Sequence, residues 1–113
     1  MNLDYFYEYC ISKEGVTEHF PFNDDALVFK VGEKMFLLSS LSSWEKGSPK
    51  VNLKCDPERA QELRAEFEGI QPGYHMSKKH WNTVAINEDV SDRLVKELID
   101  HSYELVFKKL NYK

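Results

Sequence analysis

The segment Gly73–Thr83 concentrates side chains that can contact phosphates and planar rings. In order along the chain these are Tyr74, His75, Lys78, Lys79, His80 and Trp81. Aromatic rings stack on planar groups, and ammonium groups attract phosphates or carboxylates. The segment therefore suggests a binding surface. The alternative is structural: Trp81 and Tyr74 anchor the end of a strand, and the lysines only keep that end in water.

The charge of the chain limits what such a surface can do. The net charge is −4 over 113 residues. Residues 1–25 carry six acids and one lysine, whereas residues 26–81 carry nine Lys and Arg against seven acids. Because nonspecific binding to nucleic acid scales with the number of phosphates neutralised, overall acidity argues against strong binding. A local patch in the middle of the chain would bind weakly and with a steep dependence on salt.

Recognised catalytic patterns are missing from the sequence. The five glycines are isolated, so no Gly-rich loop cradles phosphate, and no Gly-x-Ser-x-Gly turn occurs. Cys55 precedes the start of a predicted helix, where a thiol pKa could fall, but an inert packing role is favoured for it. The pattern predicts a protein that is not an enzyme and needs no cofactor.

A metal site has only weak support. His75 and His80 lie five residues apart, and His19, Asp24 and Asp25 could join them in space. No recognised ligand spacing fixes that meeting. We therefore expect no metal, and we favour a turn or capping role for the two adjacent aspartates. The two cysteines, Cys10 and Cys55, match no metal or redox spacing either and are expected to be buried free thiols.

Length and composition indicate one globular domain over residues 1–113. The hydrophobic fraction is 42% and the aromatic fraction 13%. No apolar run approaches the roughly 20 residues that cross a bilayer. The N-terminus has neither a basic start nor an apolar core, so it does not resemble a secretion signal. We expect no membrane association and a cytoplasmic location.

Periodicity predicts the elements that hold the candidate residues. Helices are expected from Leu3 to before Gly15, from Pro57 to before Gly69, and from near Asp89 or Ser91 to Lys109, with N-caps at Asn2 and Asp56. Strands are expected at 26–31, 34–39, 50–55 and 81–86, with a short strand or extended loop at 70–75. Residues 20–25 and 39–49 are expected to be loops, the second of them mobile.

The first two strands should form a hairpin through a type II′ turn at Gly32-Glu33. In that register Phe29 lies opposite Phe36, and Leu27 lies opposite Leu38. Val28, Lys30, Met35 and Leu37 would then share the other face of the sheet. The element order α-β-β-β-α-β-β-α favours an α+β two-layer sandwich, with a mainly antiparallel sheet and helices on one face. The opposite face would be partly open and carry Lys30, Lys50 and Lys54, unless it is simply a hydrated surface.

Several stretches resemble the MmcQ/YjbR family. They are Pro21-Phe22 with Asp25, residues 28–36, 53–58 and 102–106, and above all His75-Met76-Ser77-Lys78-Lys79-His80-Trp81-Asn82-Thr83. The resemblance spans nearly the whole chain. It implies a small bacterial cytosolic protein whose fold is similar to that of type III secretion chaperones. It also implies DNA binding through a double-wing arrangement of hairpins, and it brings no catalytic residues.

Two hypotheses for function follow. In the first, Lys78, Lys79 and His80 contact DNA phosphates and Trp81 or Tyr74 stacks on bases, while the Val31–Lys34 hairpin and the loop with Lys46 and Lys50 act as wings. The full candidate set is Lys30, Lys34, Lys50, Lys54, Tyr74, His75, Lys78, Lys79, His80 and Trp81. In the second, the exposed sheet face of a chaperone-like module binds a protein partner or a second copy, through apolar Val28, Met35 and Leu37 interleaved with lysines.

Overall fold

The computed structural model describes residues 1–74 and 76–110. Four helices and six strands follow one another in the order α1 (Leu3–Ile11), β1 (Val16–His19), β2 (Ala26–Val31), β3 (Lys34–Ser40), α2 (Leu41–Glu45), β4 (Lys50–Lys54), α3 (Pro57–Glu66), β5 (Ile70–Pro72), β6 (Trp81–Ala85) and α4 (Asp92–Leu110). Among these residues, no helix is long and apolar enough to span a membrane.

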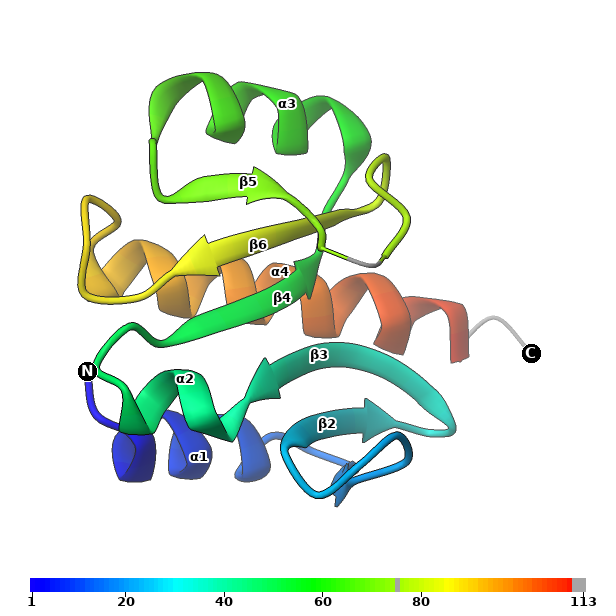
Figure 1. The fold of residues 1–113 in the computed structure, drawn as a ribbon. Helices are drawn as coiled ribbons and strands as arrows, with labels where there is room; N and C mark the ends of the chain where they lie inside the picture. Colours follow the sequence, from blue (N-terminus) through cyan, green and yellow to red (C-terminus); the bar gives the residue numbers. More distant parts are fainter. Residues whose placement is uncertain (75, 111–113) are drawn as a thin grey trace.

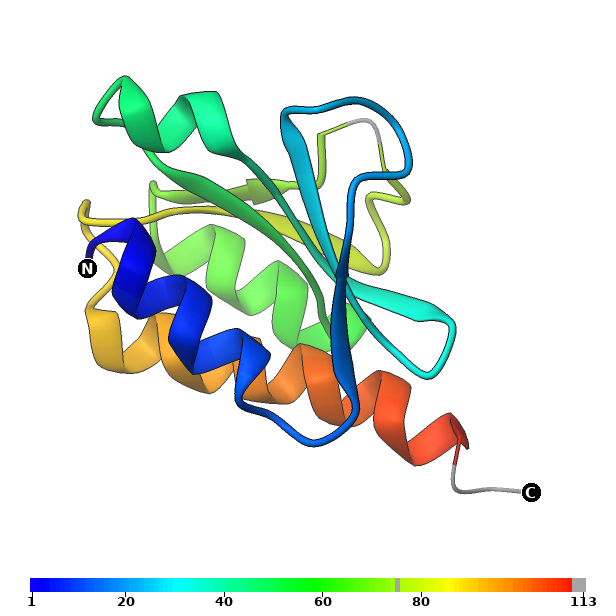
Figure 2. The ribbon, with the colours of Figure 1, turned by 90° about the horizontal axis from the view of Figure 1, so that it is seen from below.

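The strands form a single antiparallel sheet in the order β1-β2-β3-β4-β6-β5. Helices α1, α3 and α4 lie together on one side of this sheet, as Figures 1 and 2 show. The other side carries only the short helix α2 and connecting loops (Figure 2). The α+β two-layer sandwich expected from the sequence is therefore confirmed.

The hydrophobic core fills the space between the sheet and the three long helices. Leu27, Phe29, Leu53 and Val84 contribute from the strands, and the helices contribute Phe6, Cys10, Ala60, Leu63, Val95, Leu98, Ile99 and Val106, all of them buried. Burying a large apolar side chain contributes about 1.5–3 kcal/mol. This packing fixes the helices on one face, so the ends of the strands and the opposite face are left for binding.

Asn2 and Asp56, the N-caps expected from the sequence, form capping hydrogen bonds in the structure. Asn2 accepts a hydrogen bond from the amide of Tyr5, and Asp56 accepts one from the amide of Arg59. Ser91 Oγ accepts from the amide of Leu94 at the start of α4. These contacts satisfy amide groups that have no partner within the helix.

The hairpin of β2 and β3 differs from its predicted register. Gly32 has the positive φ, +64°, that a type II′ turn requires. Beyond Lys30 and Met35, however, the register shifts, so Phe29 lies opposite Leu37 and not opposite Phe36. Phe36 is therefore the extra residue of a β-bulge.

The bulge changes which apolar residues lie on the open face of the sheet. Phe36 and Leu37 are both buried, so the expectation that Leu37 lies on the open face is wrong, and Leu38 takes its place there. Val28 lies opposite Leu38 but is fully buried. Met35 and Leu38, which are only partly buried, therefore supply the apolar surface that was expected from Val28 and Leu37.

Two elements were not predicted. Strand β1 is a short, half-exposed edge strand, and it is held by its pairing with β2. Helix α2 lies inside the segment that was expected to be a mobile loop. Its start is capped from a distance, since Asp25 accepts hydrogen bonds from the amide and the hydroxyl of Ser42 and from the hydroxyl of Ser40. Both elements depend on partners that are distant in sequence.

Candidate nucleic-acid interface

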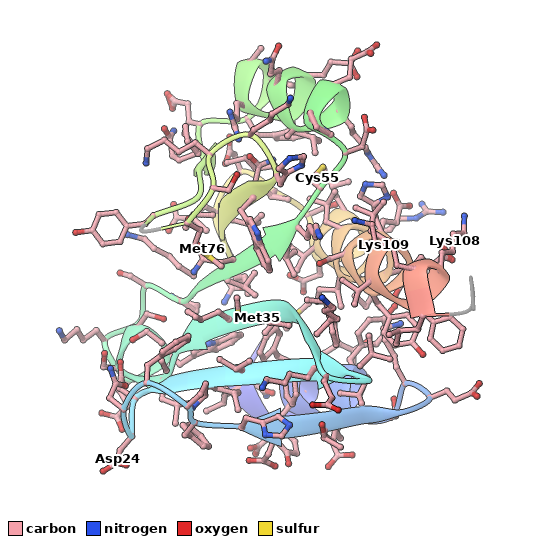
Figure 3. All side chains as sticks on the ribbon, turned by 90° about the vertical axis from the view of Figure 1, so that its right-hand side faces the viewer. Asp24, Met35, Cys55, Met76, Lys108 and Lys109 are labelled. Carbon is pink, nitrogen blue, oxygen red and sulfur yellow. The ribbon has the colours of Figure 1, made fainter. Side chains whose placement is uncertain are left out.

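Six lysines lie at one end of the molecule, and we call this set the basic end: Lys34, Lys54, Lys78, Lys79, Lys108 and Lys109. The antiparallel sheet brings the first four together. Lys34 begins β3, Lys54 ends β4 opposite Trp81 at the start of β6, and Lys78 and Lys79 lie in the turn just before that strand. The last turn of α4 adds Lys108 and Lys109 (Figure 3).

Three lysines of the basic end, Lys34, Lys54 and Lys109, are close enough for their charges to interact. Burial lowers the pKa of Lys54, and the ammonium groups of Lys109 and Lys34 lower it further. Among the described residues, the ion pairs join the N-terminus to Asp92 and Lys13 to Asp100, and neither involves a lysine of the basic end. Positive charges that repel one another and are not paired with carboxylates attract an external anion.

Fewer carboxylates than lysines lie in the segments that form this end. Glu14 lies in the turn before β1, whose first residue pairs with Val31, and Glu33 lies in the hairpin turn. Asp56 and Glu58 lie at the start of α3, and Glu104 lies one turn before Lys108 on α4. The six lysines therefore outnumber these five acids, although the whole chain carries a net charge of −4.

A groove with a volume of about 990 Å³ crosses the open face of the sheet. Its floor contains Met35, Leu38, Asn52, Trp81 and Thr83, and its sides are formed by residues of two loops: Phe22, Asn23, Tyr74, Met76 and Ser77. Trp81 is only 8% exposed. Its indole is therefore part of the groove floor and not a free stacking platform, which limits the stacking role expected for it.

The turn that carries Lys78 and Lys79 is held in place from α3. Arg64 Nε donates to Asn82 Oδ1 at 2.6 Å, and its Nη2 donates to the carbonyl oxygens of Lys78 and Trp81. Asn82 is itself buried at 2% exposure. Arg64 was not among the residues singled out from the sequence, because its role is to position a segment that is distant along the chain.

Gly73 closes the same turn from the other side. Its amide donates to the carbonyl oxygen of Trp81 at 2.8 Å. A Cβ at this position would lie 2.8 Å from Trp81 Cβ, which is too close for any side chain. The glycine therefore allows the turn to pack directly on the first residue of β6.

The predicted site residues divide into three groups. Lys34, Lys54, Lys78, Lys79 and the exposed His80 lie at the basic end, and Lys30 lies one residue from the end of β2 beside them. Tyr74 and Trp81 line the groove that starts there, and Lys50 lines its far end. The hairpin tip and the segment with Lys46 and Lys50 are thus at opposite ends of the sheet. His75 is outside the described residues.

Lys108 and Lys109 are the functional candidates that sequence reasoning missed. Two adjacent lysines in the last turn of a helix are a common response to the helix dipole, so they carry no functional signal of their own. Only the contact between the end of α4 and the β2–β3 hairpin places them beside Lys34, since Leu110 packs against Gly32.

The remaining candidate groups have structural roles. Asp25 caps α2, as expected, and the hydroxyl of Ser40 followed by the amide of Ser42 lowers the pKa of its carboxyl. Cys55 is buried, and burial raises the pKa of its thiol, which agrees with the packing role favoured for it. In the part of the chain that the structure describes, no three His, Cys, Asp or Glu side chains are grouped as metal ligands.

Comparison with known proteins places this geometry in a family. The family model named YjbR matches residues 11–105. The chain belongs to the YjbR family. The protein YbdF of Escherichia coli O157:H7 is 43% identical over 86 residues, which cover 76% of this chain and 68% of that relative. YjbR of E. coli K12 is 29% identical over 104 residues, covering 92% and 86%.

Two solved structures are similar in fold to this chain. The crystal structure of a Deinococcus radiodurans protein with a DUF419 domain superposes with a TM-score of 0.87 at 41% identity, over 96% of this chain and 80% of that one. A Pseudomonas syringae protein gives a TM-score of 0.79 at 29% identity, over 94% and 99%. YbdF and YjbR are both described as uncharacterised, so membership of the family establishes the fold without naming a ligand.

Proposed function

We propose that this YjbR-family protein binds nucleic acid through the basic end and acts by binding, without catalysis, in the cytoplasm. The observation that carries the proposal is the convergence of Lys34, Lys54, Lys78 and Lys79 from three separate segments, joined by Lys109 from α4. Phosphate contacts from clustered lysines supply most of nonspecific binding to nucleic acid. Because the rest of the chain is acidic, the proposed binding is weak and confined to this end.

Titration of labelled DNA tests the proposal. Fluorescence anisotropy with a duplex and with a single strand, at about 50 mM salt and at higher salt, should show binding that weakens as salt is added. The double variant Lys78→Glu/Lys79→Glu should lower the affinity at least about tenfold and reduce the salt slope by about 2, roughly one for each lost phosphate contact. Absence of binding at the lower salt concentration would refute the proposal.

A charge-matched control separates the basic end from net charge. The double variant Arg93→Glu/Lys96→Glu changes the total charge by the same amount at positions away from the basic end, in the first two turns of α4. We expect it to keep most of the affinity of the unmodified protein. Equal losses in the two double variants would mean that only overall charge matters.

The groove supports a second candidate function, that of a protein-interaction or chaperone-like module. Met35, Leu38 and Met76 line it, and methionine-rich surfaces adapt to apolar side chains of protein partners. In a homodimer, two copies of this face would cover each other. Sedimentation equilibrium with the unmodified protein and with Met35→Glu tests that form: a dimer that Met35→Glu dissociates supports it, and a monomer in both cases rules it out.

A further inference from the structure

The groove on the open face begins at the basic end. Met35 in its floor directly follows Lys34, and Ser77 in its wall directly precedes Lys78. Trp81, also in the floor, is the partner of Lys54 in the β4–β6 pairing. A ligand whose phosphates contact the basic end therefore has a continuous path into the groove, where Lys50 provides one more cation at the far end.

Two exposed aromatic rings stand on the sides of the groove. Phe22 is 66% exposed in the loop between β1 and β2, and Tyr74 is 70% exposed in the loop between β5 and β6. Both line the groove, although they come from segments about 50 residues apart. Exposed aromatic side chains that gather at one groove suit contact with a ligand, and a nucleobase offers a flat face to each ring.

The floor between the rings carries polar groups at a fixed position. Thr83 Oγ1 donates to Asn52 Oδ1 at 2.5 Å and accepts from the amide of Tyr74 at 3.1 Å. The Asn52 amide nitrogen, which has two hydrogens, donates one to the carbonyl oxygen of Leu38 at 3.3 Å. The floor is therefore not purely apolar, and it offers hydrogen-bonding groups to the edge of a base that enters the groove.

We propose that the nucleic acid bound by this protein is single-stranded, and that unpaired bases enter the groove beside Phe22 and Tyr74 while the backbone phosphates contact the basic end. The inference rests on the proposed function and deepens it. Bases in a duplex have both faces covered by their neighbours, so they cannot present a face to these rings. An extended peptide gains most when it adds to a free sheet edge. The strand residues of this groove come mainly from the internal strands β3, β4 and β6, and the edge strand β5 adds only Gln71 and Pro72.

Three DNA probes of equal length test the inference. They are oligo-dT of about 12 nucleotides, within the roughly 4–16 nucleotides bound by single-strand-binding folds, an abasic strand of the same length, and a duplex of that length. The abasic strand keeps the phosphates and loses the bases. We expect oligo-dT to bind at least about fivefold more tightly than the abasic strand, the lower end of the contribution of a stacked base.

Two phenylalanines provide a matched pair of variants. Phe22 lines the groove, whereas Phe20, 41% exposed and two residues away, is not part of its lining. Phe22→Ala and Tyr74→Ala should each weaken oligo-dT binding at least about fivefold and leave abasic binding unchanged. Phe20→Ala should change neither. Because all three side chains are exposed, thermal unfolding should show that every variant folds.

The outcomes separate this inference from the function on which it rests. Equal affinity for oligo-dT and the abasic strand, or equal losses for Phe22→Ala and Phe20→Ala, would overturn the single-strand inference while leaving phosphate binding at the basic end intact. Tighter binding of the duplex than of oligo-dT would do the same. Failure of all three probes to bind at low salt would overturn the proposed function itself.

Discussion

The hydroxyl of Ser102 in α4 donates a hydrogen bond at 2.5 Å to the carbonyl oxygen of Phe36, the extra residue of the bulge in β3. Ser102 Oγ also accepts a hydrogen bond from the amide of Lys54 at 2.9 Å. The paired register of β3 and β4 ends at Leu37 and Leu53, so the buried Ser102 bridges the two strands where they separate. The side chain of Ser102 thereby connects the end of β4, which carries Lys54, to the bulge in β3.

Replacing Ser102 should therefore destabilise the protein. Ser102→Ala leaves a buried carbonyl and a largely buried amide without a partner, and the expected loss is about 1–3 kcal/mol in the free energy of unfolding. Urea denaturation followed by circular dichroism measures it. Ser48→Ala, at an exposed position before β4, should stay within about 0.5 kcal/mol. Similar values for the two variants would mean that the bridge contributes nothing.

Arg64 should be needed to keep the lysine-bearing turn in place. Arg64→Met keeps the aliphatic stem and removes the bonds to Asn82 and to the carbonyl oxygens of Lys78 and Trp81. We expect a loss of about 1.5–3 kcal/mol, because a buried amide loses a charged partner. The amides of Gly73 and Trp81 should also exchange faster, since both are bonded within this turn.

A neighbour on the same helix serves as the control for Arg64. Arg59→Met removes a guanidinium earlier on α3 and should leave the exchange of both amides unchanged. Unaltered exchange at Gly73 and Trp81 in Arg64→Met would show that the turn is held by other contacts.

His101 should make stability depend on pH in one direction. Its Nε2 accepts a hydrogen bond from the amide of Asp56 at 3.1 Å, so the ring is neutral. Burial, followed by the charge of Arg59, lowers its pKa below the ordinary value of 6.5. The unfolded chain therefore takes up the proton first as the pH falls. The contribution of neutral His101 to the free energy of unfolding is complete above about pH 6.5, and it is lost as the pH falls through the lowered pKa of the folded state.

The matched variant for this prediction is His101→Gln. Its side-chain oxygen can accept the same hydrogen bond but does not titrate, and the other histidines contribute equally to both proteins. Urea denaturation between about pH 5 and pH 7 should show the unmodified protein losing stability relative to the variant as the pH falls. Parallel curves, or a relative gain at low pH, would contradict the expected direction.

The two thiols should be unreactive in the folded protein. Burial raises the pKa of Cys10 to about 12, and burial also raises that of Cys55. Because the thiolate is the nucleophile, both thiols should react with a disulfide reagent at about pH 8 only after the protein unfolds. Denatured protein should react at both sites at once, and an added Ser48→Cys should react immediately in the folded state. Rapid modification of the unmodified folded protein would show that one thiol is accessible.

The accuracy of the sequence predictions depended on the range of the interactions involved. The caps at Asn2 and Asp56 and the turn at Gly32 depend on residues only a few positions away, and they were predicted correctly. The bulge at Phe36 was not, because two consecutive large apolar residues fit either parity of a strand. The partner that stabilises it, Ser102, lies 66 residues away.

By itself, the sequence determined the layers of the fold and the candidate lysines, because hydrophobic period, capping residues and charge are local properties. Only the tertiary structure decided that Lys34, Lys54, Lys78 and Lys79 share one end with Lys109 while Lys50 does not, since antiparallel pairing sets which strand ends meet. It also decided that Trp81 is sealed into the groove floor whereas Phe22 and Tyr74 stay exposed. Exposure depends on what packs against a side chain, and in this fold the packing partners come from distant segments.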